Sequence, residues 1–276
     1  MALLISPLFF ITLSASAYIP SLDALVDKMV QQKFIPPPYK GTNELSFMDQ
    51  KCVENLTIID HQHARSDLQC GDLKFRFISD SQKKRVLYDD GAMEWTRDTT
   101  PLNELFLNRS RATVEQSLLL WKVAAPLESA TTTTPSPLTS RITIQRLGNI
   151  VATRIDPDAH IVYCLAQPSE VTHYLFIGKK TYRPRLLRRK LTRDDMTYLE
   201  EIWIKTYSNI GNQIYPKELE ILHDGKSFVK ITNRTIQPLS SVSIDFSQLS
   251  REQQETSDLA ETKPSDALIR FLKDYR

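Results

Sequence analysis

Several features that common protein classes need are scarce in this chain. Its 276 residues include only 7 glycines, and no two of them lie close enough for a phosphate-binding loop or a Gly-x-Ser-x-Gly elbow. The formal net charge is +2, so no strongly basic balance points to nucleic acid as a partner. We therefore expect no enzyme activity, no cofactor and no nucleic-acid binding.

Long apolar runs are also lacking, apart from the first 17 residues, which contain no charged side chain. That run is shorter than the roughly 20 apolar residues of a membrane-spanning helix. It ends in Ala15-Ser16-Ala17, the small-x-small pattern that signal peptidase accepts, although no Lys or Arg precedes its apolar part. We expect a signal peptide cleaved after Ala17 and a soluble, exported mature protein; an uncleaved anchor is the alternative.

Cysteine is rare as well, with Cys52, Cys70 and Cys164 in the whole chain. In an oxidising compartment one pair can close, and we expect a disulfide between Cys52 and Cys70, which flank one predicted strand. The alternative is three separately buried thiols. The spacing does not match a zinc site, so we expect no metal.

The clearest positive signal is an antiparallel meander over residues 198–235. Apolar and polar side chains alternate there with a period of two, which is typical of half-buried strands. Gly211 and the Asp224-Gly225 pair supply the turns. The pattern predicts three strands with one apolar face and one polar face.

The other elements follow from the same patterns. An amphipathic helix is expected over 21–32, with Ser21 as its N-cap, and it ends before Pro36-Pro37-Pro38. Further strands are predicted at 39–48, 56–65, 73–78, 85–88, 92–97, 141–146, 150–155, 161–166, 172–177 and 185–191. Helices are predicted at 101–108, 112–123 and 262–276, and a mobile Thr/Pro/Ser loop at 129–140.

These elements predict a mainly β fold of the α+β class. About ten antiparallel strands would form one large curved sheet, an incomplete half-barrel, because a sheet of that size tends to curl. The helical insertion at about 101–123 is well placed to cover the concave face. The domain would span 18–249, followed by a tail at 250–276 with a short amphipathic helix.

Four segments in this order resemble the LolA-type periplasmic lipoprotein carriers and their relatives, which include RseB-type sensor domains and mycobacterial lipid-carrier lipoproteins. They are residues 22–29 with 39–47, the hairpin over 86–95 with Tyr88, Asp90-Gly91 and Trp95, residues 175–184, and residues 215–221 with Tyr215-Pro216-Lys217 at their start. The chain departs from the family in its length, its Thr-rich loop, its tail and its cysteines.

The resemblance implies a half-barrel in the periplasm that shields lipid or lipoprotein acyl chains and hands them on toward the outer membrane. Its partners would then be an inner-membrane donor and an outer-membrane acceptor, and the chain would be a monomer. The alternative is a periplasmic sensor or interaction module of the same fold, which acts through protein partners.

The apolar strand residues are candidates for a lipid groove, and the apolar residues of the insertion are candidates for its lid. A solid hydrophobic core is the alternative for the same strand residues. The groove candidates are Leu45, Phe47, Phe75, Phe77, Ile202, Ile204, Leu219, Ile221, Val229 and Ile231. The lid candidates are Leu102, Leu105, Phe106, Leu118, Leu119 and Trp121.

A basic run within 179–193 is a candidate docking patch for anionic lipid headgroups or an acidic protein surface. The alternative is a charged strand and turn that resist aggregation. The run contains Lys179, Lys180, Arg183, Arg185, Arg188, Arg189, Lys190 and Arg193. His61 and His63 are predicted on one face of a strand, but two histidines without a third ligand favour a solvated surface over a metal site.

Overall fold

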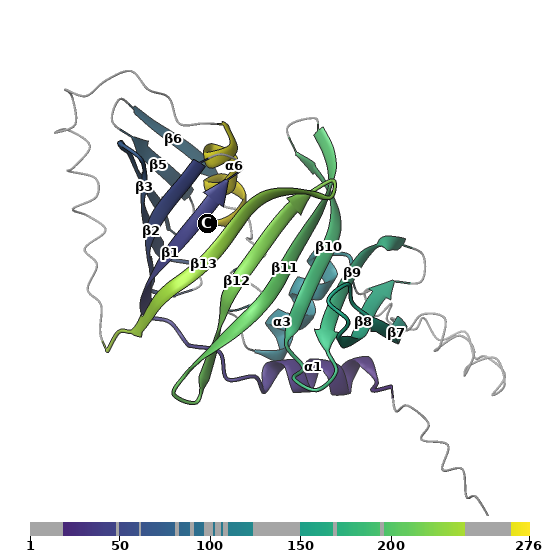
Figure 1. The fold of residues 1–276 in the computed structure, drawn as a ribbon. Coiled ribbons are helices and arrows are strands. Elements are labelled where there is room, and N and C mark those ends of the chain that lie inside the picture. The colour runs from purple at the N-terminus through teal and green to yellow at the C-terminus, as the bar shows by residue number, and fades with distance from the viewer. Residues whose placement is uncertain are drawn as a thin grey trace, which may run out of the picture.

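The computed structural model describes residues 19–47, 50–60, 62–80, 83–88, 91–96, 102, 106, 110–123, 150–167, 170–193, 196–240 and 266–276. Within these ranges the chain forms one 13-stranded antiparallel sheet and three helices of nine or ten residues (Figure 1). The sheet is curved and open, and its edges are the strands β6 and β7. The predicted mainly β half-barrel is confirmed.

Two meanders meet at the centre of this sheet. One runs outward in chain order to an edge: β1 (Tyr39–Phe47), β2 (Gln50–Ile58), β3 (Ala64–Cys70), β4 (Leu73–Ser79), β5 (Lys83–Tyr88) and β6 (Gly91–Thr96). The other returns from the opposite edge: β7 (Ile150–Ile155), β8 (Ile161–Gln167), β9 (Glu170–Gly178), β10 (Pro184–Arg193), β11 (Met196–Ile210), β12 (Gln213–His223) and β13 (Lys226–Pro238).

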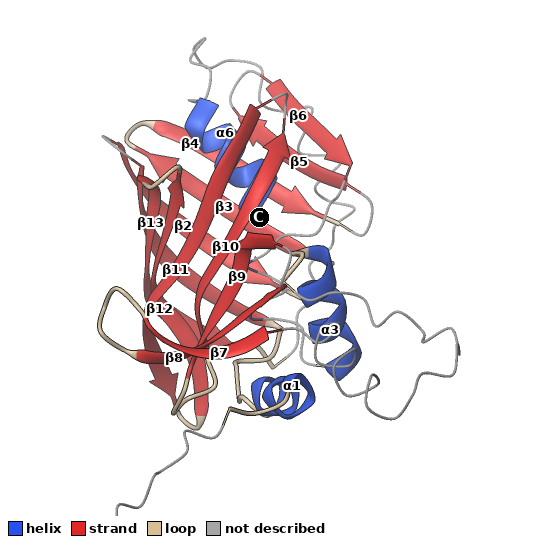
Figure 2. Ribbon diagram, turned by 90° about the vertical axis from the view of Figure 1, so that its right-hand side faces the viewer, coloured by secondary structure: helices blue, strands red, loops and turns tan. Residues whose placement is uncertain are grey.

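The central pairing joins β1 and β13, which are far apart in sequence. Leu45 lies opposite Ile231, and Phe47 opposite Val229. The chain leaves one edge after β6 and re-enters at the other edge with β7. Of the residues between these two strands, the structure describes the helix α3 (Arg111–Leu120), which lies on the concave side of the sheet (Figures 1 and 2).

The three helices are α1 (Leu22–Val30), α3 (Arg111–Leu120) and α6 (Asp266–Tyr275). Ser21 and Ser110 accept hydrogen bonds from the first turns of α1 and α3, as N-cap residues do. In Figures 1 and 2, α1 and α3 lie at one end of the concave face and α6 at the other. Apolar side chains of all three helices join one core cluster with the strands.

The strand predictions are confirmed in most places and wrong in one. Where one strand was expected over 56–65, the structure has the end of β2, then residues 59, 60, 62 and 63 outside any strand, and the start of β3. His63 therefore lies between the two strands, where its Nδ1 is 2.9 Å from a carboxylate oxygen of Asp60. The expected strand placement of His63 is wrong, and His61 lies outside the described residues.

The disulfide between Cys52 and Cys70 is confirmed. The two cysteines do not flank one strand, however: Cys52 is on β2 and Cys70 on β3, and these strands are paired neighbours. Cys164 is a free thiol. Among the predicted features, the signal peptide, the tract 129–140, the strand 141–146, Leu105 and residues 250–265 of the tail lie outside the described ranges. No described helix is long and apolar enough to span a membrane.

Candidate functional site: the concave face of the sheet

The concave face is built from alternate residues of both meanders. Strand β1, for example, is buried at every second position, because successive side chains point to opposite faces. All ten groove candidates are at most 7% exposed, and all ten belong to one contiguous cluster. The structure therefore brings together the residues that sequence periodicity selected.

Four of the six lid candidates pack against this face. Leu102, Phe106, Leu118 and Trp121 are buried in the same cluster as the strand residues. Leu119 is 41% exposed, so its assignment to the inner side of the lid is wrong. Neighbouring residues of a helix point about 100° apart, and Leu118 takes the inward position.

Helix α3, which carries two of the lid candidates, is tied to α1 by charged side chains at the surface. Arg111 of α3 donates hydrogen bonds to Asp23 and Asp27 of α1, at 2.5 and 2.6 Å. The same guanidinium also contacts Glu115 one turn further along α3. All four side chains are at least 43% exposed, so these ion pairs contribute little to stability.

At the other end, α6 fills the concave face. The side chains of Leu268, Phe271, Leu272 and Tyr275 are at most 1% exposed. The Phe271 ring packs edge-on against Phe47 of β1, with centroids 5.3 Å apart. The sequence signal for this helix, apolar residues at i, i+3, i+4 and i+7, was recognised, but its docking on the groove was not.

A buried carboxylate on β2 holds the end of α6. Glu54 is completely buried and accepts hydrogen bonds from Arg276 Nε at 2.6 Å and Nη2 at 2.7 Å. Asn43 Nδ2 and Ser66 Oγ also donate to it, at 2.7 and 2.6 Å. Burial alone would raise the pKa of Glu54, but Arg276 and these hydrogen bonds lower it below the usual range.

A second buried carboxylate, Glu200 of β11, lies under the same helix. It receives its cation from the sheet, because Arg189 of β10 pairs with it. From α6 it receives only a hydroxyl, since Tyr275 donates to Glu200 at 2.5 Å. Burial, with Glu200 next to the phenol, raises the pKa of Tyr275 well above its usual value. Neither carboxylate was identified from the sequence as part of a site.

A lysine on the sheet meets the last turn of α6. Lys84 of β5 is 1% exposed, and its ammonium donates to the carbonyl of Lys273 at 2.9 Å. A cation at this end of a helix is stabilising, because the last carbonyls carry a partial negative charge. The sheet therefore holds α6 with polar contacts as well as with an apolar face.

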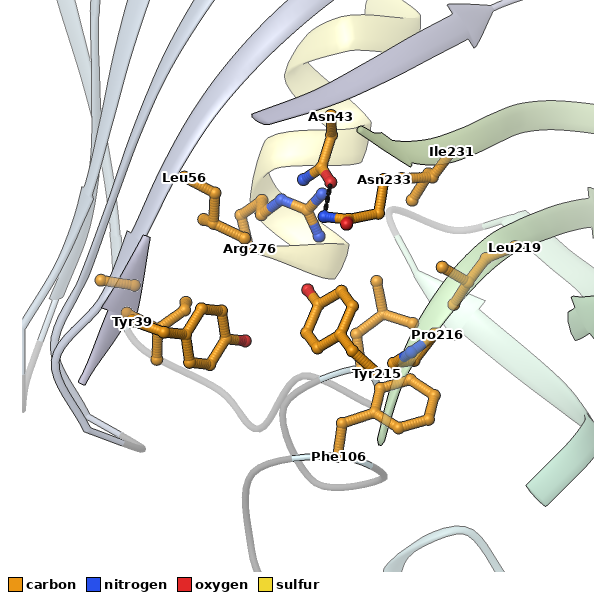
Figure 3. A pocket seen from close by; sticks show the side chains of 13 residues that line it. Tyr39, Asn43, Leu56, Phe106, Tyr215, Pro216, Leu219, Ile231, Asn233 and Arg276 are labelled. Atoms are coloured by element: carbon orange, nitrogen blue, oxygen red, sulfur yellow. Dashed lines mark hydrogen bonds between the residues drawn. The ribbon is translucent and has the colours of Figure 1, made fainter. Parts of the chain in front are cut away.

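A small pocket remains between the lid and the end of α6 (Figure 3). Its volume is about 40 Å³. A water needs about 10–15 Å³ by the same measure, and drug-sized ligand sites usually enclose 300–1,000 Å³. The pocket therefore has room for a few waters and not for an acyl chain. With the helices in place, the ten groove candidates are packed as part of a core.

Polar and aromatic groups converge on this pocket. Tyr39 and Tyr215 approach edge to face, with ring centroids 5.6 Å apart, and burial raises the pKa of both phenols. Asn233 Nδ2 donates to Asn43 Oδ1 at 2.9 Å (Figure 3). Arg276 closes one side, and Leu102 and Phe106 of the insertion are also among the lining residues.

The basic run does not form one free surface. Arg189 is 8% exposed and paired with Glu200 inside, so its assignment to a docking patch is wrong. The period of two explains the difference, because it places Arg189 on the same face as Leu187. Arg188, on the other face, lies 5.5 Å from the Tyr174 ring centre and pairs with Glu201.

The remaining members of the run differ in their surroundings. Arg183 lies over the Tyr207 ring, and Arg185 pairs with Asp156. Lys180 and Lys190 are exposed, and Lys179 is half-buried. For Arg193 only the backbone pairing is described. A docking role for these residues stays a prediction.

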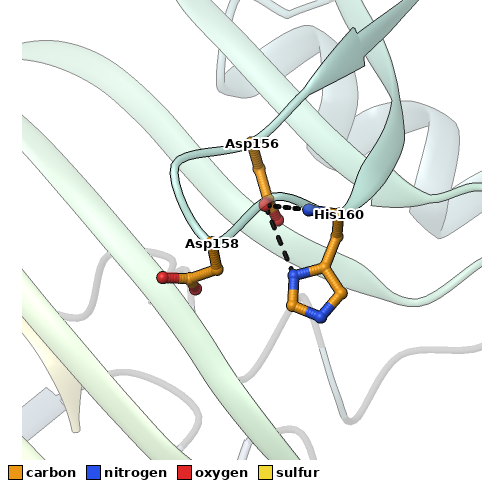
Figure 4. A group of neighbouring side chains, drawn as sticks. All are labelled: Asp156, Asp158 and His160. Atoms are coloured by element: carbon orange, nitrogen blue, oxygen red, sulfur yellow. Dashed lines mark hydrogen bonds and ion pairs between the residues drawn. The ribbon is translucent and has the colours of Figure 1, made fainter.

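The turn between β7 and β8 brings two carboxylates and a histidine together (Figure 4). Asp156 is buried and accepts from the backbone N–H of His160 at 2.8 Å and from Arg185 Nε at 2.6 Å. Burial would raise its pKa, but these contacts lower it. Because the Arg185 guanidinium already neutralises the carboxylates, we interpret Asp156, Asp158 and His160 as a salt-bridged turn.

No protein-family model and no curated protein matches this chain. The solved structures to which this chain is similar include three of bacterial proteins. One is a putative outer membrane lipoprotein-sorting protein domain from Vibrio parahaemolyticus, with 8% identity over 77% of this chain and 90% of that one, and a TM-score of 0.41. The second is a LolA superfamily protein from Nitrosomonas europaea, with 8% identity over 81% and 96% and a TM-score of 0.44.

The third is a DUF1329 family protein from Desulfovibrio piger, with 10% identity over 84% of this chain and 98% of that one, and a TM-score of 0.39. All three likenesses are weak, with identities of 8–10% and TM-scores of 0.39–0.44. At such identities and TM-scores they carry no argument about a ligand. The chemistry of the concave face has to supply that argument.

Proposed function

We propose that this chain is an exported carrier that holds an acyl chain of a lipid or lipoprotein on the concave face of its sheet. One observation carries the proposal: apolar side chains from both meanders form one continuous face, and helices from three separate segments cover it. Such helices can move apart without breaking a sheet hydrogen bond. A ligand could then take their place on the face.

The energetics allow binding without any reactive group. Each buried CH2 contributes about 0.8 kcal/mol, so an acyl chain of about 15 such groups gains on the order of 12 kcal/mol. Association costs an estimated 4–15 kcal/mol in lost freedom. Displacing a helix adds a further cost, so we expect reversible binding, which suits a protein that takes up and releases its cargo.

The proposal includes export with cleavage after Ala17, a periplasmic location and transfer between a membrane donor and an acceptor. A second candidate function, a sensor or interaction module, is favoured by one observation: the occupant of the face is an amphipathic helix, α6. A carrier releases lipid to an acceptor, whereas a sensor keeps a stable protein partner. Purification from the native compartment distinguishes them.

A photoreactive fatty acid with a terminal diazirine tests the acyl-chain site directly. We expect crosslinks on peptides that contain Ile204, Leu219 or Ile231, and competition by unlabelled fatty acid. Ile204→Glu should abolish the crosslinks, while Thr206→Glu at an exposed position of the same strand should leave them unchanged. Crosslinks confined to the outer face of the sheet, or none at all, would refute the proposed site.

A further inference from the structure

The two carboxylates under α6 differ in what the sheet provides for them. Glu200 is paired by Arg189, so the sheet neutralises that charge by itself. Glu54 is paired by Arg276, which belongs to the segment that covers the sheet. When α6 and Arg276 leave, Glu54 keeps Asn43 and Ser66 as hydrogen-bond donors but loses its cation.

The surroundings of Glu54 make that loss costly. The carboxylate is completely buried, and it lies between Cys52 and Leu56 on the inward side of β2. Removing one partner of a buried ion pair leaves an uncompensated charge in a poorly solvated place. If the occupant had only an apolar chain, the Glu54 carboxylate would stay buried without a cation. An occupant that brings a cation would replace Arg276.

We propose that Glu54, with Asn43 and Ser66 beside it, is a receptor for one cationic group carried on an apolar body, and that Arg276 with α6 is the occupant this chain carries itself. The inference rests on the proposed function and narrows its ligand class. The ligands it favours are acyl or alkyl compounds whose polar end is an ammonium or a guanidinium.

The geometry of the present occupant supports this assignment. The guanidinium offers two parallel N–H groups to the two oxygens of Glu54, at 2.6 and 2.7 Å. The third nitrogen of the guanidinium, Nη1, donates to the carbonyl of Tyr275 within α6. Glu54 on the sheet therefore accepts from only two of the three nitrogens. Next to it, Phe271 and Tyr275 supply the apolar body, and the Arg276 guanidinium lies 4.7 Å from the Phe271 ring centre.

The pocket beside Arg276 is a place where the cationic end of an incoming ligand could first bind. It is lined by both Asn43 and Arg276, together with Tyr39 and Tyr215 (Figure 3). Asn233 continues the polar side of the pocket through its hydrogen bond to Asn43. An incoming cation would therefore meet amide oxygens and phenols before it reaches Glu54.

The test compares alkyl probes on the full chain with and without Arg276. The probes are dodecylguanidinium, dodecanol, dodecanoate and butylguanidinium, each below its aggregation concentration. Arg276→Ala vacates the cation position at Glu54, and Arg234→Ala is the matched control, because Arg234 pairs with the exposed Glu44. Occupancy is measured by native mass spectrometry and by the shift in the midpoint of thermal unfolding.

We expect dodecylguanidinium to bind Arg276→Ala at least about tenfold more tightly than dodecanol does, which is about 1.4 kcal/mol. It should also bind this variant more tightly than wild type or Arg234→Ala. Adding Glu54→Gln to Arg276→Ala should remove the preference over dodecanol. If Arg276→Ala does not fold, Arg276→Lys is used, since a single ammonium pairs with Glu54 less well than the bidentate guanidinium.

The outcomes separate this inference from the proposed function. Equal binding of dodecylguanidinium, dodecanol and dodecanoate would overturn the receptor and leave the acyl-chain site intact. Equal binding of dodecylguanidinium and butylguanidinium would overturn the apolar part, because the cation alone would then suffice. If no probe binds any variant, both proposals fail.

Discussion

The two ends of the concave face are covered by different means. At one end, α3 is tied to α1 by Arg111 and two aspartates that are more than half exposed. At the other end, Arg276 is 7% exposed and Glu54 is completely buried, and α6 also receives Lys84 at its last turn. The charged contacts of α3 are thus exposed and those of α6 are buried, so losing the contacts of α6 should cost more stability.

This difference would give the two ends of the proposed site different roles, one in ligand entry and one in ligand selection. Exposed ion pairs contribute roughly 0–1 kcal/mol and weaken with salt, so the lid end suits entry and exit. The buried pair sets which occupant is accepted, because an unmatched charge there costs several kcal/mol. Entry and selection would thus lie at opposite ends of one face.

The largest loss of stability is expected from a substitution at the α6 end of the concave face. Arg276→Ala should lower the free energy of unfolding by about 3–5 kcal/mol, because Glu54 is left buried without its cation. Chemical denaturation measures this, with Arg234→Ala as the surface control. A loss of less than about 1 kcal/mol would show that α6 is held no more firmly than the lid.

The next largest loss of stability is expected from the packing of α3 on the sheet. Leu119, one residue after the buried Leu118, provides the control. Leu118→Ala should cost about 2–5 kcal/mol, because Leu118 is 1% exposed. Leu119→Ala should stay within about 0.5 kcal/mol of wild type, since Leu119 is 41% exposed. Equal costs for the two variants would contradict the orientation of α3 on the sheet.

Lowering the pH should reduce the stability of the protein through Glu54 at the α6 end. The pKa of Glu54 is lowered in the folded protein, so its contribution is present above its unfolded pKa, about 4.3, and is lost as the pH falls through the folded value. The stability of wild type should therefore fall more steeply below about pH 4 than that of Glu54→Gln. Parallel pH profiles would show that folding does not lower the pKa of Glu54.

The smallest effect is expected for the surface ties of the lid. Arg111→Ala should lower the free energy of unfolding by no more than about 1 kcal/mol, and that difference should shrink when the salt concentration is raised. Urea unfolding at two salt concentrations measures it. A cost that is large and independent of salt would remove the contrast between the two ends.

Much of the sheet could be predicted because each half-buried strand shows its own period of two. The meander of β11, β12 and β13 and the apolar face with Ile204 and Leu219 were found in this way. Strand pairing across long sequence distances leaves no local pattern, so the junction of β1 with β13 was not predicted.

The strand that carries Glu54 shows why part of the site was missed. A buried carboxylate interrupts the apolar alternation of β2, so the first half of that strand was not recognised. Its partner Arg276 is 222 residues away in sequence. The amphipathic pattern of α6 predicts a helix with an apolar side, but no local signal states which surface that side covers.

The central claim is that the concave face binds an acyl chain, and native mass spectrometry of the full chain purified from its own exported compartment tests it most directly. Organic extraction then identifies anything that is bound. The account predicts a mass above that of the protein alone, with a lipid or acylated peptide in the extract that Ile204→Glu abolishes and Thr206→Glu retains. A protein of bare mass that takes up no lipid or lipopeptide on incubation would contradict it.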